Sequence, residues 1–130
     1  MIKQLIRAAL FSASFLFLSA SAYALDKIPF TADKFQAAQQ AGRPILVDVF
    51  ATWCPTCKAQ APVLEELAAR PEYKGLTVFE VNFDNQKDVV RNFGVRVQST
   101  LIAFKGSKET ARSTGETSEA GIEKVIKAAF

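Results

Sequence analysis

Apolar residues occur along the chain both in short continuous runs and in stripes at helical spacing. The continuous runs cover residues 45–51, 76–83 and 100–104, are rich in Val, Ile, Leu and Phe, and are typical of buried strands. A more polar run, residues 109–114, follows the turn-forming segment 105–107 and predicts a strand at the edge of a sheet. These runs predict a sheet of at least four strands.

Four segments carry apolar residues at helical spacing: residues 31–41, the segment after Cys54, residues 85–93 and the segment after Ser118. We expect Thr31, Asn85 and Ser118 to be N-caps, because their side-chain oxygens can accept a backbone N–H of the first turn. Residues 25–29 are expected to be a lead-in without regular structure. The order α, β, α, β, α, β, β, α predicts an α/β fold with a central mixed sheet and helices on both faces.

Two cysteines lie where the pattern changes from strand to helix, in the run Cys54-Pro55-Thr56-Cys57. The first turn of a helix has unpaired N–H groups and a partial positive charge, which favour a thiolate over a thiol. A thiolate is the attacking species in thiol–disulfide exchange. We therefore predict that Cys54 attacks and is the more exposed and more acidic thiol, while Cys57 resolves the mixed disulfide. A structural disulfide or half of a metal site is the alternative, which the position at a helix start disfavours.

Residues 1–24 have the pattern of a cleaved signal peptide. Lys3 and Arg7 precede an apolar stretch, residues 8–20, and Ala22-Tyr23-Ala24 has the small-x-small cleavage pattern. Cleavage two residues earlier is a second option, and an uncleaved anchor is disfavoured because the apolar stretch is short for a bilayer. We expect one domain, residues 25–130, in the periplasm or secreted.

Charge and cysteine content narrow the classes of function. The predicted signal holds two of the 16 basic residues, so 14 basic and 13 acidic residues remain and nothing indicates binding to nucleic acid. The chain has only two cysteines, close together, so no disulfide framework is available to stabilise an exported fold. The pair is better explained by chemistry than by structure.

Residues 53–58, Trp-Cys-Pro-Thr-Cys-Lys, resemble the W-C-x-x-C-K active site of the thioredoxin superfamily. The resemblance extends from about residue 28 to the end of the chain, with Asp48 on a strand and Pro62 within a helix at matching places. It implies a thioredoxin fold and a thiol–disulfide oxidoreductase that uses a Cys54/Cys57 disulfide, with no dissociable cofactor and no metal ligand. It also implies that Asp48 is a proton acceptor for Cys57.

The chain departs from the family at two positions. Thioredoxins often carry a Lys near the buried Asp, where this chain has Glu80; either the two carboxylates interact and raise one pKa, or Glu80 faces solvent. The segment 94–100 resembles the family's G-x-x-x-x-P-T, but its cis-Pro is replaced by Ser99. Because a cis bond before a residue other than proline costs about 3 kcal/mol, we expect the Gln98–Ser99 bond to be trans or strained.

The replacement of the cis-Pro leads to three further expectations. The Ser99 hydroxyl is expected to face the sulfurs as a donor, with a merely repacked loop as the alternative. Substitution of Ser99 by proline is expected to keep or raise activity. The surface that docks a partner chain is expected to include six residues: Trp53, Pro55, Thr56, Gln98, Ser99 and Thr100.

The direction of the redox reaction follows from what the chain lacks. The sequence has no His, so no imidazolium can stabilise the Cys54 thiolate, which argues against a strong oxidant. We expect a monomeric, exported reductase of oxidised protein substrates, itself reduced by a membrane electron transporter. The alternative is a metal or iron–sulfur module, because a dimer would supply four thiolates.

Overall fold

One mixed sheet of five strands, in the order β1-β3-β2-β4-β5, organises this computed structural model, which describes residues 26–130. The strands are β1 (Asp26–Pro29), β2 (Pro44–Phe50), β3 (Thr77–Asn82), β4 (Thr100–Lys105) and β5 (Lys108–Thr114). β1 and β2 both run parallel to β3, whereas β4 is antiparallel to β2 and β5 is antiparallel to β4. The predicted signal peptide and both of its cleavage sites lie outside the described residues.

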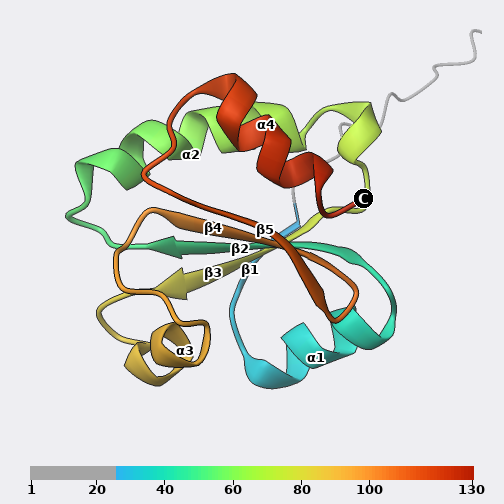
Figure 1. Ribbon diagram of the computed structural model, residues 1–130, viewed down its shortest axis with the longest axis horizontal. Coiled ribbons are helices and arrows are strands. Elements are labelled where there is room, and N and C mark those ends of the chain that lie inside the picture. Colours follow the sequence, from blue (N-terminus) through green and yellow to red (C-terminus); the bar gives the residue numbers. More distant parts are fainter. Residues whose placement is uncertain (1–25) are drawn as a thin grey trace, which may run out of the picture.

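The helices cover both faces of the sheet. They are α1 (Ala32–Gln40), α2 (Pro55–Ala68), the 3-10 helix η1 (Pro71–Tyr73), α3 (Lys87–Asn92) and α4 (Glu119–Lys127). α2 and α4 lie on one face, and α1 and α3 lie on the other (Figure 1). The predicted α/β fold is therefore confirmed. Within residues 26–130, no helix has the length and apolar character needed to cross a bilayer.

β1 was not expected from the sequence. The segment predicted to be an irregular lead-in is a strand that pairs in parallel with β3, so that Ile28 lies beside Phe79. A strand of four residues that contains Asp, Lys and Pro has too weak a pattern to be identified alone. This segment is a strand because it pairs with β3, and not because its own residues favour strand structure.

Two of the three predicted N-caps are confirmed and one is wrong. The side chains of Thr31 and Ser118 accept backbone N–H groups at the first turns of α1 and α4. α3 instead begins after Gln86, which makes no side-chain cap hydrogen bond. Asn85 lies in the preceding turn, where the Asn82 side chain accepts its backbone N–H at 3.0 Å. The turn before α3 is therefore ordered by the side chain of Asn82, and Asn85 does not cap the helix.

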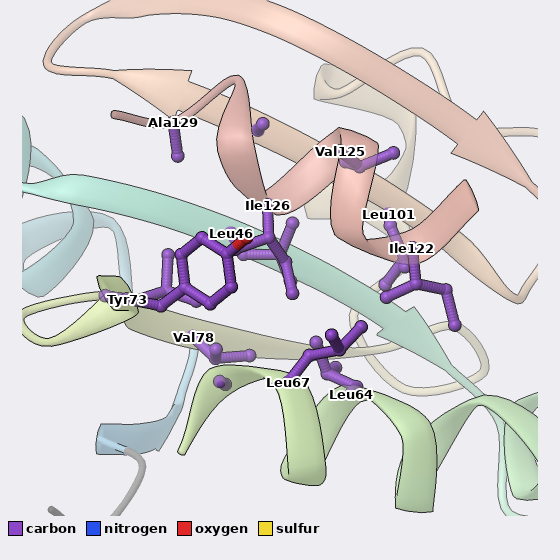
Figure 2. Packing of buried hydrophobic residues seen from close by; sticks show 13 residues of the cluster. Leu46, Leu64, Leu67, Tyr73, Val78, Leu101, Ile122, Val125, Ile126 and Ala129 are labelled. Atoms are coloured by element: carbon purple, nitrogen blue, oxygen red, sulfur yellow. The ribbon is translucent and has the colours of Figure 1, made fainter. Parts of the chain in front are cut away.

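β2 is buried on both faces, and its alternation decides which side chains meet which helices. Ile45, Val47 and Val49 pack in the cluster under α1 and α3, whereas Leu46 packs in the cluster under α2 and α4. Figure 2 shows the second cluster, in which side chains from the sheet, α2 and α4 interlock. Because successive strand residues point to opposite faces, Asp48 lies on the same face as Leu46 and is directed toward α2.

Phenylalanine rings fill the opposite cluster. The ring centroid of Phe35, on α1, lies 5.2–5.5 Å from those of four other rings: Phe30, Phe79, Phe93 and Phe104. Three of these four contacts are edge-to-face, the geometry that aromatic quadrupoles favour. Phe30, directly before the N-cap Thr31, and Phe35, in the first turns of α1, form a hydrophobic staple within this cluster.

The Phe35 cluster predicts a large cost for truncating its central ring. Phe35→Ala should lower the free energy of unfolding by about 3 kcal/mol, because it removes aromatic contacts and leaves a cavity. Urea denaturation measures the change, and Gln36→Ala, at an exposed site on the same helix, is the control. A loss below about 1 kcal/mol would show that α1 is not held by this cluster.

Candidate active site

The two cysteines form a disulfide at the point where β2 leads into α2. Cys54 is the N-cap of α2, Pro55 occupies the first helical position, and the Cα atoms of Cys54 and Cys57 are 5.3 Å apart. The backbone N–H of Cys57 donates to the Sγ of Cys54 at 3.0 Å. The helix N-terminus is thus directed at the sulfur of Cys54, the arrangement that stabilises negative charge on that atom.

The prediction that Cys54 is the more exposed cysteine is wrong for the disulfide form. Cys54 is 0% exposed and Cys57 is 9% exposed. The side chain of Cys54 packs with Ala51, with Phe50 and Phe83 beside them. In the disulfide form the sulfur of Cys54 is therefore both hydrogen-bonded to the N–H of Cys57 and buried by its apolar neighbours.

Trp53 is the exposed residue at this junction. Its side chain is 56% exposed, and its indole N–H donates to the Oδ2 of Asp84 at 2.8 Å. Asp84 follows β3, so this hydrogen bond joins the loops after two neighbouring parallel strands. Asp84 was not identified from the sequence, because it is 31 residues from Trp53 and lies in a polar turn. It fixes a large apolar surface next to the disulfide.

A cavity of about 190 Å³ extends from Cys57 to Asp48. Its lining includes the charged side chains of Lys27, Lys58 and Glu80. Asp48 is buried, and burial is the main reason that its pKa rises to about 6; the charge of Lys27 lowers this pKa and that of Glu80 raises it. The structure therefore brings together the two predicted residues Asp48 and Cys57 beside a space that can hold water.

Glu80 lies directly beside Asp48 in the register of β2 and β3, on the same face of the sheet. It does not simply face solvent: it lines the cavity and accepts a 2.9 Å ion pair from the Nζ of Lys27. Burial lowers the pKa of Lys27, but hydrogen bonding to Glu80 and the charges of Glu80, Asp48 and Glu65 raise it above the ordinary value. A cation is therefore present near Asp48, although it comes from β1.

Lys27 is a site residue that sequence reasoning missed. It lies 21 positions before Asp48 in a segment expected to be irregular, and reaches the cavity because β1 and β2 both pair with β3. Its Nζ is also 3.6 Å from Glu65 on α2. In the sequence, Lys27 is only a basic residue in a short segment before the first strong strand, which does not identify it as part of the site.

The Gln98–Ser99 bond is trans, as expected, and Ser99 has a φ of 59°. This left-handed conformation is unusual for a residue other than glycine and is a site of backbone strain. The hydroxyl of Ser99 donates to the carbonyl of Gln98 rather than to a sulfur, which corrects the expectation of a donor facing the disulfide. Thr100 donates to the carbonyl of Val97 at 2.8 Å and begins β4 beside Val49.

Gln60 links this turn to the active-site helix. Its side chain, 2% exposed, donates from Nε2 to the backbone carbonyls of Ser99 at 3.1 Å and Glu116 at 2.7 Å. The sequence offered one signal that was overlooked, a Gln at a buried position of α2 one turn after Cys57. The turn predicted to dock partners is thus attached to the helix that carries the disulfide.

The metal-binding alternative gains no support from the geometry. Across residues 26–130, no group of three or more His, Cys, Asp or Glu side chains is placed to hold a metal ion. One chain offers only the sulfurs of Cys54 and Cys57, and these are joined to each other.

Comparison with known proteins gives a consistent result. The thioredoxin family model matches residues 26–128. A thioredoxin of Alicyclobacillus acidocaldarius is 41% identical over 81 residues, which cover 62% of this chain and 76% of the relative. The solved structure of Trxlp from Edwardsiella tarda superposes with a TM-score of 0.75 at 44% identity, covering 77% of this chain and 97% of the other. Thioredoxin NaTrxh from Nicotiana alata superposes with a TM-score of 0.69 at 29% identity, covering 83% and 96%.

The pKa of Asp48 predicts how stability depends on pH. Since the folded carboxyl has a pKa of about 6 and the ordinary value is 3.8, folding favours the protonated form. This stability is fully present below about pH 4 and is lost as the pH rises to about 6, by at most about 3 kcal/mol. Asp48→Asn should therefore be more stable than the wild type at pH 7 and about equal to it at pH 3.5, as measured by urea denaturation. A difference that does not change between these pH values would contradict the raised pKa.

Proposed function

The chain belongs to the thioredoxin family, and on that premise we propose that it is an exported reductase of disulfides in protein substrates. Thioredoxins act on oxidised proteins through a pair of redox-active cysteines and use no dissociable cofactor, and this chain is accordingly a thiol–disulfide oxidoreductase. The observation that carries the proposal is the Cys54–Cys57 disulfide at the start of α2, with Asp48 beside it across a small cavity.

The geometry supports a two-step exchange that starts from the reduced protein. The Cys54 thiolate, favoured by the N–H of Cys57 and the helix N-terminus, attacks one sulfur of a substrate disulfide, and the other substrate sulfur leaves as a thiolate. Cys57 then gives its proton to the Asp48 carboxylate, directly or through water in the cavity, and attacks the Sγ of Cys54. The second substrate thiolate leaves, two electrons have passed to the substrate, and the Cys54–Cys57 disulfide remains.

Asp48 suits the second step because of its environment. A carboxyl with a pKa of about 6 is ionised at neutral pH, yet it is a much better proton acceptor than a solvated aspartate. The cavity gives it a path to Cys57, while Lys27 and Glu80 bring opposing charges to the same space. We assign to Asp48 the role of proton acceptor in resolution.

The direction, location and partners are proposed on other grounds. The chain has no His to stabilise a strongly oxidising Cys54 thiolate, which favours reduction of substrates. The signal pattern of residues 1–24 supports export to the periplasm or beyond, where a membrane electron transporter would return electrons to the pair. The protein is proposed to act as a monomer and to dock substrates with six residues: Trp53, Pro55, Thr56, Gln98, Ser99 and Thr100.

The direction is tested by the reduction potential of the Cys54/Cys57 pair. Equilibration with glutathione buffers should give a value near that of thioredoxin, about −270 mV, and the reduced protein should reduce insulin disulfides. Thioredoxin, a reductant, and DsbA, an oxidant, are the reference proteins. A potential of about −120 mV, with no reduction of insulin, would show that the protein is an oxidant and contradict the proposal.

The roles of the two cysteines are tested by trapping. Cys57→Ser should accumulate mixed disulfides with oxidised protein substrates, because Cys54 still attacks and nothing resolves the product. Cys54→Ser is the matched control and should trap little, since the first-turn N–H that favours a thiolate is donated to the sulfur of Cys54 and not to that of Cys57. Non-reducing gels and mass spectrometry measure the adducts. Equal trapping by both variants would contradict an attacking and a resolving cysteine.

A further inference from the structure

Gln60 is a buried polar residue of α2 that the proposed chemistry does not use. The nitrogen of its amide donates to two backbone carbonyls, those of Ser99 and Glu116. Its Oε1 is buried and has no hydrogen-bond partner among residues 26–130. A buried acceptor without a partner is unfavourable for folding, which offsets part of what the two hydrogen bonds of Gln60 contribute. What Gln60 specifically provides is a link from α2 to these two backbone segments.

The two carbonyls belong to segments that are far apart in the sequence. Ser99 directly precedes β4, and Glu116 lies between β5 and α4. The carbonyl of Ser99 also accepts the backbone N–H of Gly115 at 2.9 Å, so both of its acceptor positions are used. Gln60 thus fastens α2 to the start of β4 and to the end of β5 at the same time.

The segment that Gln60 holds is the strained one. Ser99 is the one residue other than glycine with a positive φ in the described part of the chain. A strained backbone persists only where its surroundings determine it, and such strain is concentrated at functional sites. Strain at Ser99 and the unpaired oxygen of Gln60 are two unfavourable features joined by one hydrogen bond of 3.1 Å.

The position of this segment connects it to the disulfide. Thr100 pairs with Val49 near the carboxyl end of β2, the strand that leads to Cys54. Gln60 lies three residues after Cys57, on the next turn of the same helix. The connection between α3 and β4 reaches the sheet on the side where α2 begins (Figure 1). A change at Gln60 would therefore move the turn relative to the sulfurs.

We propose that Gln60 is a positioning residue: its amide holds the turn formed by Gln98, Ser99 and Thr100 in the conformation that docks the backbone of a protein disulfide. The inference rests on the proposed function, which makes this turn a docking element. The peptide bonds of this turn are all trans, and the side chain of Gln60 on α2 fixes its conformation. Recognition of polypeptide substrates then depends on Gln60, whereas a small disulfide reaches the cysteines without pairing with the turn.

The test compares a protein substrate with a small one. Gln60→Leu removes both hydrogen bonds at similar volume. Loss of the donor to the two carbonyls is offset in part because the unpaired oxygen is removed and the carbonyl of Ser99 keeps the N–H of Gly115, so the protein should fold with lower stability. We expect the KM for insulin reduction to rise about tenfold and kcat to stay within about twofold, as for an interaction that acts in binding. The rate with 5,5′-dithiobis(2-nitrobenzoate) should stay within about twofold. If Gln60→Leu does not fold, Gln60→Met, which is more adaptable, takes its place in the same comparison.

A control variant separates positioning from stability. Thr77→Val, on β3 away from the turn, removes a different buried polar atom that has no hydrogen-bond partner among residues 26–130, and should leave the KM for insulin unchanged. An unchanged KM in Gln60→Leu, or equal losses with insulin and the small disulfide, would overturn the inference.

A substitution by proline tests the link between the two residues. The φ of 59° at Ser99 does not fit a proline ring, which requires about −65°, so Ser99→Pro alone should raise the KM for insulin. This replaces the sequence-based expectation that proline keeps or raises activity. In the Gln60→Leu background, Ser99→Pro should raise the KM for insulin by a smaller factor, because Gln60 no longer holds the turn in the conformation that Ser99 adopts. If the KM of the double variant equals the product of the two single effects, the two residues are not coupled.

The outcomes for the wild type distinguish this inference from the proposed function. Wild-type protein that reduces neither insulin nor the small disulfide would overturn the function and the inference together. Wild-type protein that reduces both, with Gln60→Leu indistinguishable from it, would overturn the inference alone.

Discussion

The hydrogen bond from the N–H of Cys57 to the Sγ of Cys54 depends on α2 beginning immediately after β2. Pro55 fixes the first helical position, and Cys54 then becomes the cap whose sulfur accepts the backbone N–H of Cys57. The buried strand and the apolar stripe of α2 hold this junction in place from both sides. The chemistry of the pair thus follows from where a strand ends and a helix begins.

The same strand places the acid that the pair needs. Because side chains of β2 alternate between the faces, Asp48 points toward α2 and not toward the phenylalanine cluster. Its neighbour across the sheet is Glu80, and the cation that balances these carboxylates comes from Lys27 on β1. The order β1-β3-β2 puts Glu80 on the strand between Lys27 and Asp48. A short edge strand therefore contributes to the electrostatics of the cavity.

Sequence patterns predicted what local physics determines strongly. The long apolar strands, the caps at Thr31 and Ser118 and the redox pair at the start of a helix are each specified by neighbouring residues. β1, Lys27 and Gln60 were missed because their roles arise only from pairing and packing between distant segments. The predicted exposure of Cys54 was wrong for a related reason: its burial involves packing with Phe83, which lies far from Cys54 in the sequence.

The central claim is that burial raises the pKa of Asp48 beside Cys57 and that the charges of Lys27 and Glu80 shift this pKa in opposite directions, and an NMR titration of the Asp48 carboxyl carbon tests it most directly. In wild-type protein the midpoint should lie at about 6. It should move up in Lys27→Met and down in Glu80→Gln, since these changes remove the cation and the neighbouring anion. Lys34→Met, at an exposed site on α1, should leave it unchanged. A midpoint near the ordinary 3.8 in all four proteins would contradict the account.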